Sequence, residues 1–156
     1  MAEPIVEQIA AKIKTALETI TTANGYNQTV AEVVRPTRLG GVKPENNLLV
    51  LQQGDPVRDD DANTPHMYLQ WIQPFTVDCF IIPSDKSETA VETAINRIRA
   101  DVEKVARANA QWDSLALDTR IGDPMHFPPD AGAFDGVRVV LEVLYRTLED
   151  DPYAQI

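Results

Sequence analysis

The chain contains 156 residues, a length at which one domain spanning residues 1–156 is expected. Hydrophobic residues make up 44% and charged residues 24%, as in an ordinary globular protein. The 24 Asp and Glu residues outnumber the 14 Lys and Arg residues. The resulting net charge of −10 argues against a domain that grips nucleic-acid phosphates or an anionic membrane surface.

The first predicted element is an amphipathic helix in residues 4–23. Its apolar side chains recur at spacings of three and four from Val6 to Ile20, and Asn24-Gly25 is a typical stop signal. Two short strands are predicted after it, in residues 29–34 and 48–53. The segment between these strands, residues 35–47, is expected to be irregular.

A long strand is predicted in residues 67–81, where odd positions from Met67 to Ile81 are mostly apolar and even positions are more polar. Pro74 marks an edge position or a bend in this strand. A second helix follows in residues 84–109, with an apolar stripe from Val91 to Val105 and charged residues such as Asp101 on its other faces. The last strand, residues 137–145, shows the same alternation of apolar and polar side chains as the long strand in residues 67–81.

These elements predict an α+β fold in which a mostly antiparallel or mixed sheet has two long amphipathic helices packed on one face. Half-polar strands suit a sheet with one face on helices and the other toward water. Residues 53–65 are expected to form a long hairpin loop between two strands.

Residues 110–136 are expected to form the longest loop, which at this size is either a binding element or poorly ordered. The loop contains three aromatic residues, Trp112, Phe127 and Phe134. Aromatic residues in loops often anchor an interface between subunits or with a partner. They also tuck beneath a loop as a small satellite core, and the two interpretations have equal weight.

The residues that could carry catalysis do not form a recognisable motif. His66 and His126 lack metal-ligand spacing, and residues 59–64 lack the glycine and the distal carboxylate of a calcium loop. Cys79 falls on the apolar face of its strand, where a thiol behaves as a small hydrophobic group. The chain is therefore not expected to be an enzyme, and no catalytic residue, metal or cofactor is assigned.

The setting expected from the sequence is the cytoplasm. A single cysteine forms no intramolecular disulfide, and no apolar stretch approaches the ~20 residues that span a bilayer. The first residues are acidic and lead into an amphipathic pattern, unlike a signal peptide.

The order of elements resembles the tail terminator, or tail completion, family of long-tailed bacteriophages. The resemblance is carried by the opening helix in residues 5–20, the strand Gln73-Pro74-Phe75-Thr76-Val77, the helix in residues 93–106 and the closing strand in residues 137–146. The acidic ending Glu149-Asp150-Asp151-Pro152-Tyr153 is similar to what many phage minor tail and neck proteins show. The likeness covers nearly the whole chain as a pattern.

The resemblance implies a structural protein of the virion tail and neck, assembled in the host cytoplasm. Members of this family form a ring, usually a hexamer, that caps the tail tube, stops its polymerisation and offers a docking surface for the head connector. The implied partners are other copies of the chain, the tail tube protein and the connector or neck protein, with a sheath protein as a further candidate. DNA passes through such a ring without specific binding.

The acidic loop residues Asp59, Asp60 and Asp61 are the candidates for facing the lumen of such a ring, where negative charge would repel DNA phosphates. Two alternatives remain open. A head–tail connector or stopper protein of the neck is the near neighbour in function. A small acidic metal-dependent enzyme or ligand-binding domain is the alternative of a different class.

Overall fold

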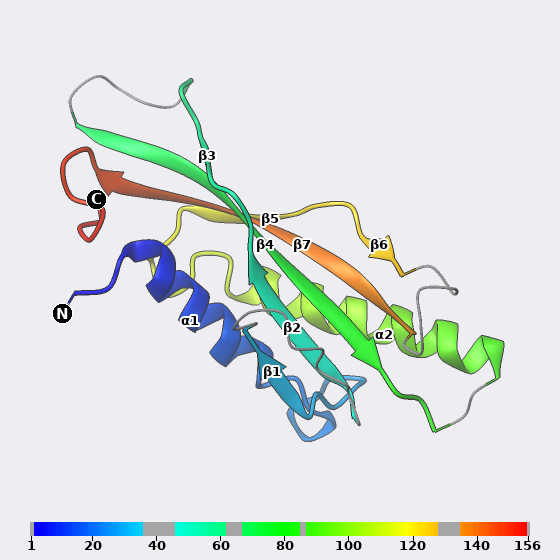
Figure 1. Cartoon of the computed structure of the whole chain (residues 1–156). Helices are drawn as coiled ribbons and strands as arrows, with labels where there is room; N and C mark the ends of the chain where they lie inside the picture. Colours follow the sequence, from blue (N-terminus) through cyan, green and yellow to red (C-terminus); the bar gives the residue numbers. More distant parts are fainter. Residues whose placement is uncertain (1, 36–45, 62–66, 85–86, 128–134, 156) are drawn as a thin grey trace.

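The computed structural model describes residues 2–35, 46–61, 67–84, 87–127 and 135–155 (Figure 1). It has a mixed α+β fold, as predicted. In chain order the elements are α1 (Ile5–Leu17), the 3-10 turn η1 (Thr22–Asn24), β1 (Glu32–Val34), β2 (Leu48–Gln53), β3 (Val57–Arg58), β4 (Tyr68–Ile81), α2 (Glu88–Ala108), β5 (Asp118–Ile121), β6 (Met125–His126) and β7 (Asp135–Leu148).

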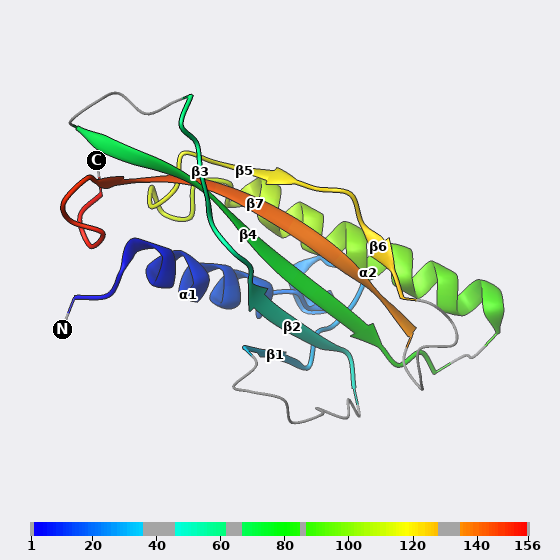
Figure 2. The same cartoon turned by 45° about the horizontal axis from the view of Figure 1, so that its top comes forward.

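The two longest strands, β4 and β7, form the centre of a seven-stranded sheet. All 14 residues of β4 pair antiparallel with all 14 of β7, from Tyr68 opposite Leu148 to Ile81 opposite Asp135. Figure 2 shows the two strands side by side along their whole length. The alternating patterns in residues 67–81 and 137–145 therefore predicted both strands correctly.

The sheet order is β1-β2-β4-β7-β5, with β3 also on β4 and β6 also on β7. Within the described residues, β1 and β2 form the only parallel pair, and the other pairings are antiparallel. The prediction of a mixed, mostly antiparallel sheet is confirmed. The outer strands of the main path, β1 and β5, are short.

One buried cluster joins both helices to the odd-numbered residues of the strands. The members contributed by α1 are Ile5, Ile9, Ala10, Ile13 and Leu17, those contributed by α2 are Ile95, Ile98, Val102, Val105 and Ala106, and those contributed by β4 and β7 include Phe75, Val77, Cys79, Val137, Val139, Leu141 and Val143. These side chains are 9% exposed or less, so the spacing of apolar residues predicted the core.

The first helix ends earlier than predicted. α1 stops at Leu17, and the chain reaches Gly25 through the turn η1, where the hydroxyl of Thr21 accepts a hydrogen bond from the Asn24 N–H. Threonine competes with helical backbone bonding in this way and so disfavours continuation of the helix. Ile20 is nevertheless fully buried, because the chain after the helix still packs on the core.

Asp101 of α2 lies in the interior, although the pattern placed it on an outer face. It is 1% exposed, and its carboxylate accepts hydrogen bonds from the backbone N–H groups of Asn27 and Gln28, at 3.0 and 2.8 Å, and from the Asn27 side-chain amide at 3.1 Å. Three donors compensate for the loss of hydration of this buried carboxylate. The contact fixes the connection between α1 and β1 against α2.

Both long segments that were expected to be loops contain strands. β3 lies within residues 53–65, and β5 and β6 lie within residues 110–136. β5 has the sequence Asp-Thr-Arg-Ile, and its charged residues are exposed, so it carries little hydrophobic signal. Its place is set by pairing with β7 from Leu141 to Leu144, which is a tertiary contact.

β2 and β3 lie along the same edge of β4, and a bend at Gly54 separates them. The Gly54 N–H donates to the Pro74 carbonyl at 2.9 Å, but Pro74 has no N–H with which to return the bond. The side-chain amide of Gln73 donates to the Gly54 carbonyl instead, at 2.6 Å. Gln73 is 1% exposed and thus replaces the missing backbone donor inside the core.

We predict that Gln73→Met lowers the free energy of unfolding by about 1–3 kcal/mol, because it leaves the half-buried Gly54 carbonyl without the Gln73 donor. In a Pro74→Ala background the same change should cost clearly less, since residue 74 then supplies its own N–H. Urea unfolding of the four proteins in this double-mutant cycle measures the difference. An equal cost in both backgrounds would show that Gln73 does not substitute for the proline N–H.

Candidate functional site

The three acidic residues predicted to face a lumen have different surroundings. Asp59 is half-buried, and its carboxylate accepts a hydrogen bond from the Gln70 side-chain amide at 2.9 Å. Gln70, 6% exposed, in turn accepts from the Arg146 guanidinium at 2.9 Å. The Arg146 guanidinium lies 4.3 Å from the centre of the Tyr68 ring. Asp59 is therefore part of a polar network that joins the end of β3 to β4 and β7.

Asp60 and Asp61 are exposed beyond the end of β3, and Asp60 forms an ion pair with Arg58. An exposed pair of this kind contributes little to stability because both partners stay hydrated. These two residues are consequently the part of the acidic loop whose charge faces water in the single chain. Their position relative to a lumen stays a prediction.

Trp112 packs inside the chain. Its side chain is 2% exposed, and the indole N–H donates to the Thr119 hydroxyl at 2.8 Å. That hydroxyl donates in turn to the Ala110 carbonyl at 2.7 Å. The arrangement corresponds to the satellite-core interpretation and ties the chain after α2 to β5.

Phe127 is half-buried and stacks on Phe80 of β4, with ring centres 5.3 Å apart. Gly136 of β7 lies beside this stack, where a Cβ would come within 2.8 Å of the Phe127 ring and 2.1 Å of the Cys79 carbonyl oxygen. Glycine is thus required for the rings to meet across the strand. Phe134, the third aromatic candidate, lies outside the described residues.

Three consecutive residues, Trp112, Asp113 and Ser114, have left-handed backbone angles, with φ of 45°, 59° and 67°. Non-glycine residues pay about 1–2 kcal/mol each for this conformation. Contacts from both ends of the chain hold the turn: Lys12 of α1 forms an ion pair with Asp113 at 2.6 Å, and the Gln155 amide donates to the Ser114 carbonyl. Such strain often accompanies a functional element.

Asp78 of β4 and Arg138 of β7, both at even-numbered positions, form a bidentate ion pair across the two central strands. The guanidinium donates to the two carboxylate oxygens at 2.6 and 2.9 Å, and Asp78 is 5% exposed. The hydrogen bond to Asp78 raises the pKa of Arg138, so the guanidinium stays charged at any ordinary pH. The two residues are directly opposite in the register and help to fix it.

The groups capable of chemistry are dispersed. Burial and the neighbouring Asp78 charge raise the pKa of the Cys79 thiol, which is fully buried and therefore unreactive. His126 is exposed on β6, while His66 lies outside the described residues. Among the residues that the structure describes, no group of three or more His, Cys, Asp or Glu side chains is placed to hold a metal ion.

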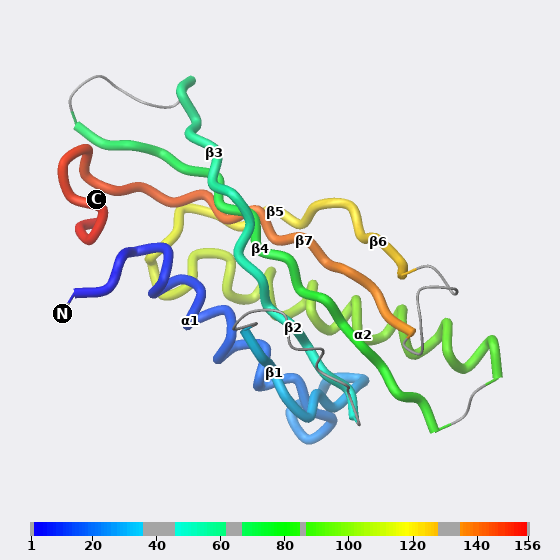
Figure 3. Tube along the Cα trace, in the orientation of Figure 1, coloured from blue at the N-terminus to red at the C-terminus, as the bar shows by residue number. Residues whose placement is uncertain are grey.

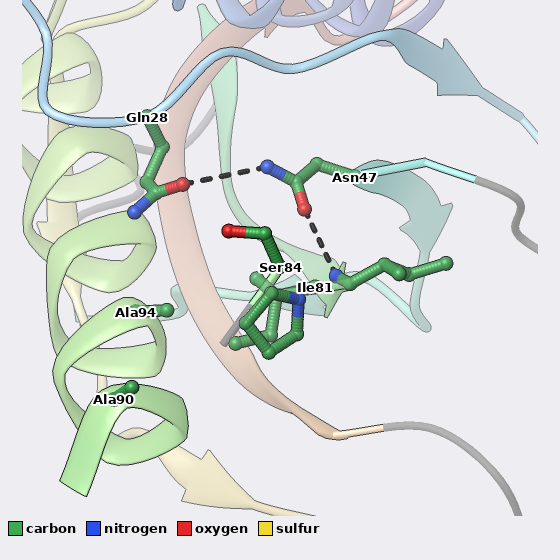
Figure 4. A pocket seen from close by; sticks show the side chains of 8 residues that line it. Gln28, Asn47, Ile81, Ser84, Ala90 and Ala94 are labelled. Atoms are coloured by element: carbon green, nitrogen blue, oxygen red, sulfur yellow. Dashed lines mark hydrogen bonds between the residues drawn. The ribbon is translucent and has the colours of Figure 1, made fainter. Parts of the chain in front are cut away.

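A shallow hollow lies where β4 leads toward α2 (Figure 4). The Asn47 side chain crosses it, donating to Gln28 at 3.4 Å and accepting from the Ile82 N–H at 3.0 Å. Ala90 and Ala94 of α2 form another wall. The amide nitrogen and the amide oxygen of Asn47 thus link the segment before β2 to the segments before β1 and after β4. This role is structural.

No family model matches the chain, and no curated protein matches it. No helix in the described part of the chain has the length and apolar character needed to cross a membrane.

We predict that Ser114→Gly raises the free energy of unfolding by about 0.5–1 kcal/mol, because glycine relieves left-handed strain at an exposed position. Ser114→Ala is the matched control and should give no increase, since alanine keeps the Cβ that causes the strain. Urea unfolding at 25 °C measures both. Equal stabilities for the glycine and alanine variants would contradict the strained turn.

Proposed function

We propose that this chain is a ring-forming structural protein of the tail and neck of a long-tailed bacteriophage. In this proposal the ring, a hexamer in the family that the sequence resembles, caps the tail tube, ends its polymerisation and receives the head connector. The α+β fold and the central antiparallel strands agree with that family. The finer arrangement, with both helices on one face of the sheet, belongs to the same proposal.

The observation that carries the proposal is that the sheet ends in two unlike short edges. One outer strand is β1, with three residues, and the other is β5, with four. A closed ring needs two different patches on each subunit, joined head to tail. Unlike edges on opposite sides of one sheet provide such a pair of patches.

The charges on these edges favour contact between copies over random aggregation. β5 carries exposed Asp118 and Arg120, and β1 carries exposed Glu32. Charged residues on edge strands prevent unselective strand pairing. In a chain with net charge −10, contact between copies requires local attraction, which Arg120 of one copy and Glu32 of the next can supply.

The acidic surface suits a channel that DNA traverses. Asp60 and Asp61 remain exposed at the end of β3 and are the candidates for the lumen, while Asp59 is engaged with Gln70. Negative charge on a channel wall opposes the counterion-driven binding of phosphates. The proposal thus assigns the repulsive role to two of the three acids.

A connector or stopper protein of the neck would also form a ring through two different patches on each subunit, and it is the nearest alternative. The metal-dependent enzyme or ligand-binding domain lacks a supporting cluster within the described residues. It predicts a monomer or dimer whose melting temperature rises with Mg²⁺ or Ca²⁺. A ring protein does not require a metal ion.

We predict that the purified chain forms one discrete closed oligomer, visible by native mass spectrometry and as rings by negative-stain electron microscopy. Arg120→Glu should break the oligomer into smaller species that remain folded by circular dichroism, because Arg120 is exposed and forms no ion pair within the described part of the chain. Arg97→Glu, the same charge change on an exposed position of α2, should leave the oligomer intact.

A chain that stays monomeric at ~100 μM, a concentration at which contacts of about −5.5 kcal/mol or stronger populate complexes, would contradict the ring. Equal dissociation by Arg120→Glu and Arg97→Glu would show that the β5 edge is not the specific contact between copies. It would not contradict the formation of a ring by the unmodified chain.

A further inference from the structure

At the end of the sheet where β4 begins and β7 ends, the helix-facing side carries an open apolar groove. Figure 3 shows that the start of α1 and the C-terminal turn lie at this same end. The Ile5 N–H, at the start of the helix, donates to the Pro152 carbonyl at 3.3 Å. The C-terminal turn thereby caps α1 and forms one wall of the groove.

Two neighbouring cross-strand pairs form the floor. Leu69 lies opposite Thr147, and Trp71 lies opposite Tyr145. Val6 of α1 lines the side. The groove holds about 260 Å³, which is below the usual range of ~300–1,000 Å³ for small-molecule sites and matches one large side chain of a partner.

Two buried hydroxyl groups in this floor have no hydrogen-bond partner in the described part of the chain. Tyr145 is 7% exposed and Thr147 is 4% exposed, and neither side chain donates or accepts a bond there. Burial raises the pKa of Tyr145, in keeping with a poorly hydrated phenol. Hydroxyl groups that line a groove and have no partner in the described part of the chain are available to bond to the polar atoms of a ligand.

The rim of the groove is acidic. Glu149 lines it, and Asp150 and Glu3 are exposed on the neighbouring turn and at the start of α1. None of these three carboxylates is paired with a cation in the part of the chain that the structure describes. The field at the groove therefore favours a positively charged partner.

We propose that this groove binds a segment of another protein that presents one large apolar side chain between Lys or Arg residues. The apolar side chain fills the floor beside Trp71, polar atoms of the segment bond to the Tyr145 and Thr147 hydroxyls, and the basic residues meet the acidic rim. A second copy of the chain is a poor occupant, because its own charge is −10. The inference goes beyond the proposed ring and applies equally to a single, unassembled chain.

The test is a titration of the ¹⁵N-labelled chain with three blocked peptides, Gly-Lys-Phe-Lys-Gly, Gly-Glu-Phe-Glu-Gly and Gly-Lys-Ala-Lys-Gly. The Trp71 indole N–H and the backbone N–H groups of Leu69 and Thr147 report on the groove. We expect saturable shifts with the Lys-Phe-Lys peptide, with a dissociation constant below ~1 mM, and at least tenfold weaker binding of the other two.

Tyr145→Phe should leave the melting temperature unchanged or raise it, and should weaken the Lys-Phe-Lys peptide about three- to tenfold. Glu149→Lys should weaken this peptide as well, whereas Glu92→Lys, an exposed charge change on α2, should not. Absence of saturable binding, equal binding of the three peptides, or a marked loss of stability in Tyr145→Phe would each overturn the proposal. These measurements do not depend on ring formation, so a result that contradicts the groove proposal does not contradict the ring proposal.

Discussion

The pairing of β4 with β7 is the constraint on which the rest of the structure depends. All 14 residues of each strand are paired, and the apolar residues at odd positions in the middle of the ladder belong to the buried cluster. A slip of one residue would turn the buried set outward, so the register must be fixed. The Asp78–Arg138 pair and the Phe80–Phe127 stack across Gly136 both depend on that register and stabilise it.

The ladder is longer than either helix. A strand of 14 residues extends about 46 Å, whereas a helix of 13 residues such as α1 extends only about 20 Å and one of 21 residues such as α2 about 31 Å. One end of the ladder therefore carries specialised surfaces. One face there holds the Arg146–Gln70–Asp59 network, and the other holds the groove over Tyr145 and Thr147.

The sequence was most informative where burial is periodic. Alternation in residues 67–81 and 137–145 predicted the central strands, and helical spacing predicted α2. β5 was not predicted because it has only four residues, and its charged residues are exposed, so it carries little hydrophobic signal. It is a strand because it pairs with β7. The burial of Trp112 and Tyr145 and the role of Gln73 beside Pro74 depend on contacts between distant segments, which local patterns do not encode.

Hydrogen–deuterium exchange along β4 and β7 tests whether the ladder is continuous to the end where β4 begins and β7 ends. We predict that backbone N–H groups paired between the strands at residues 68–71 and 145–148 exchange far more slowly than those of an unstructured chain, with the strongest protection around Phe75 and Leu141. Exchange at residues 68–71 and 145–148 at the rate of an unfolded peptide would contradict it. That result would mean that the groove and the polar network are not preformed in the free chain.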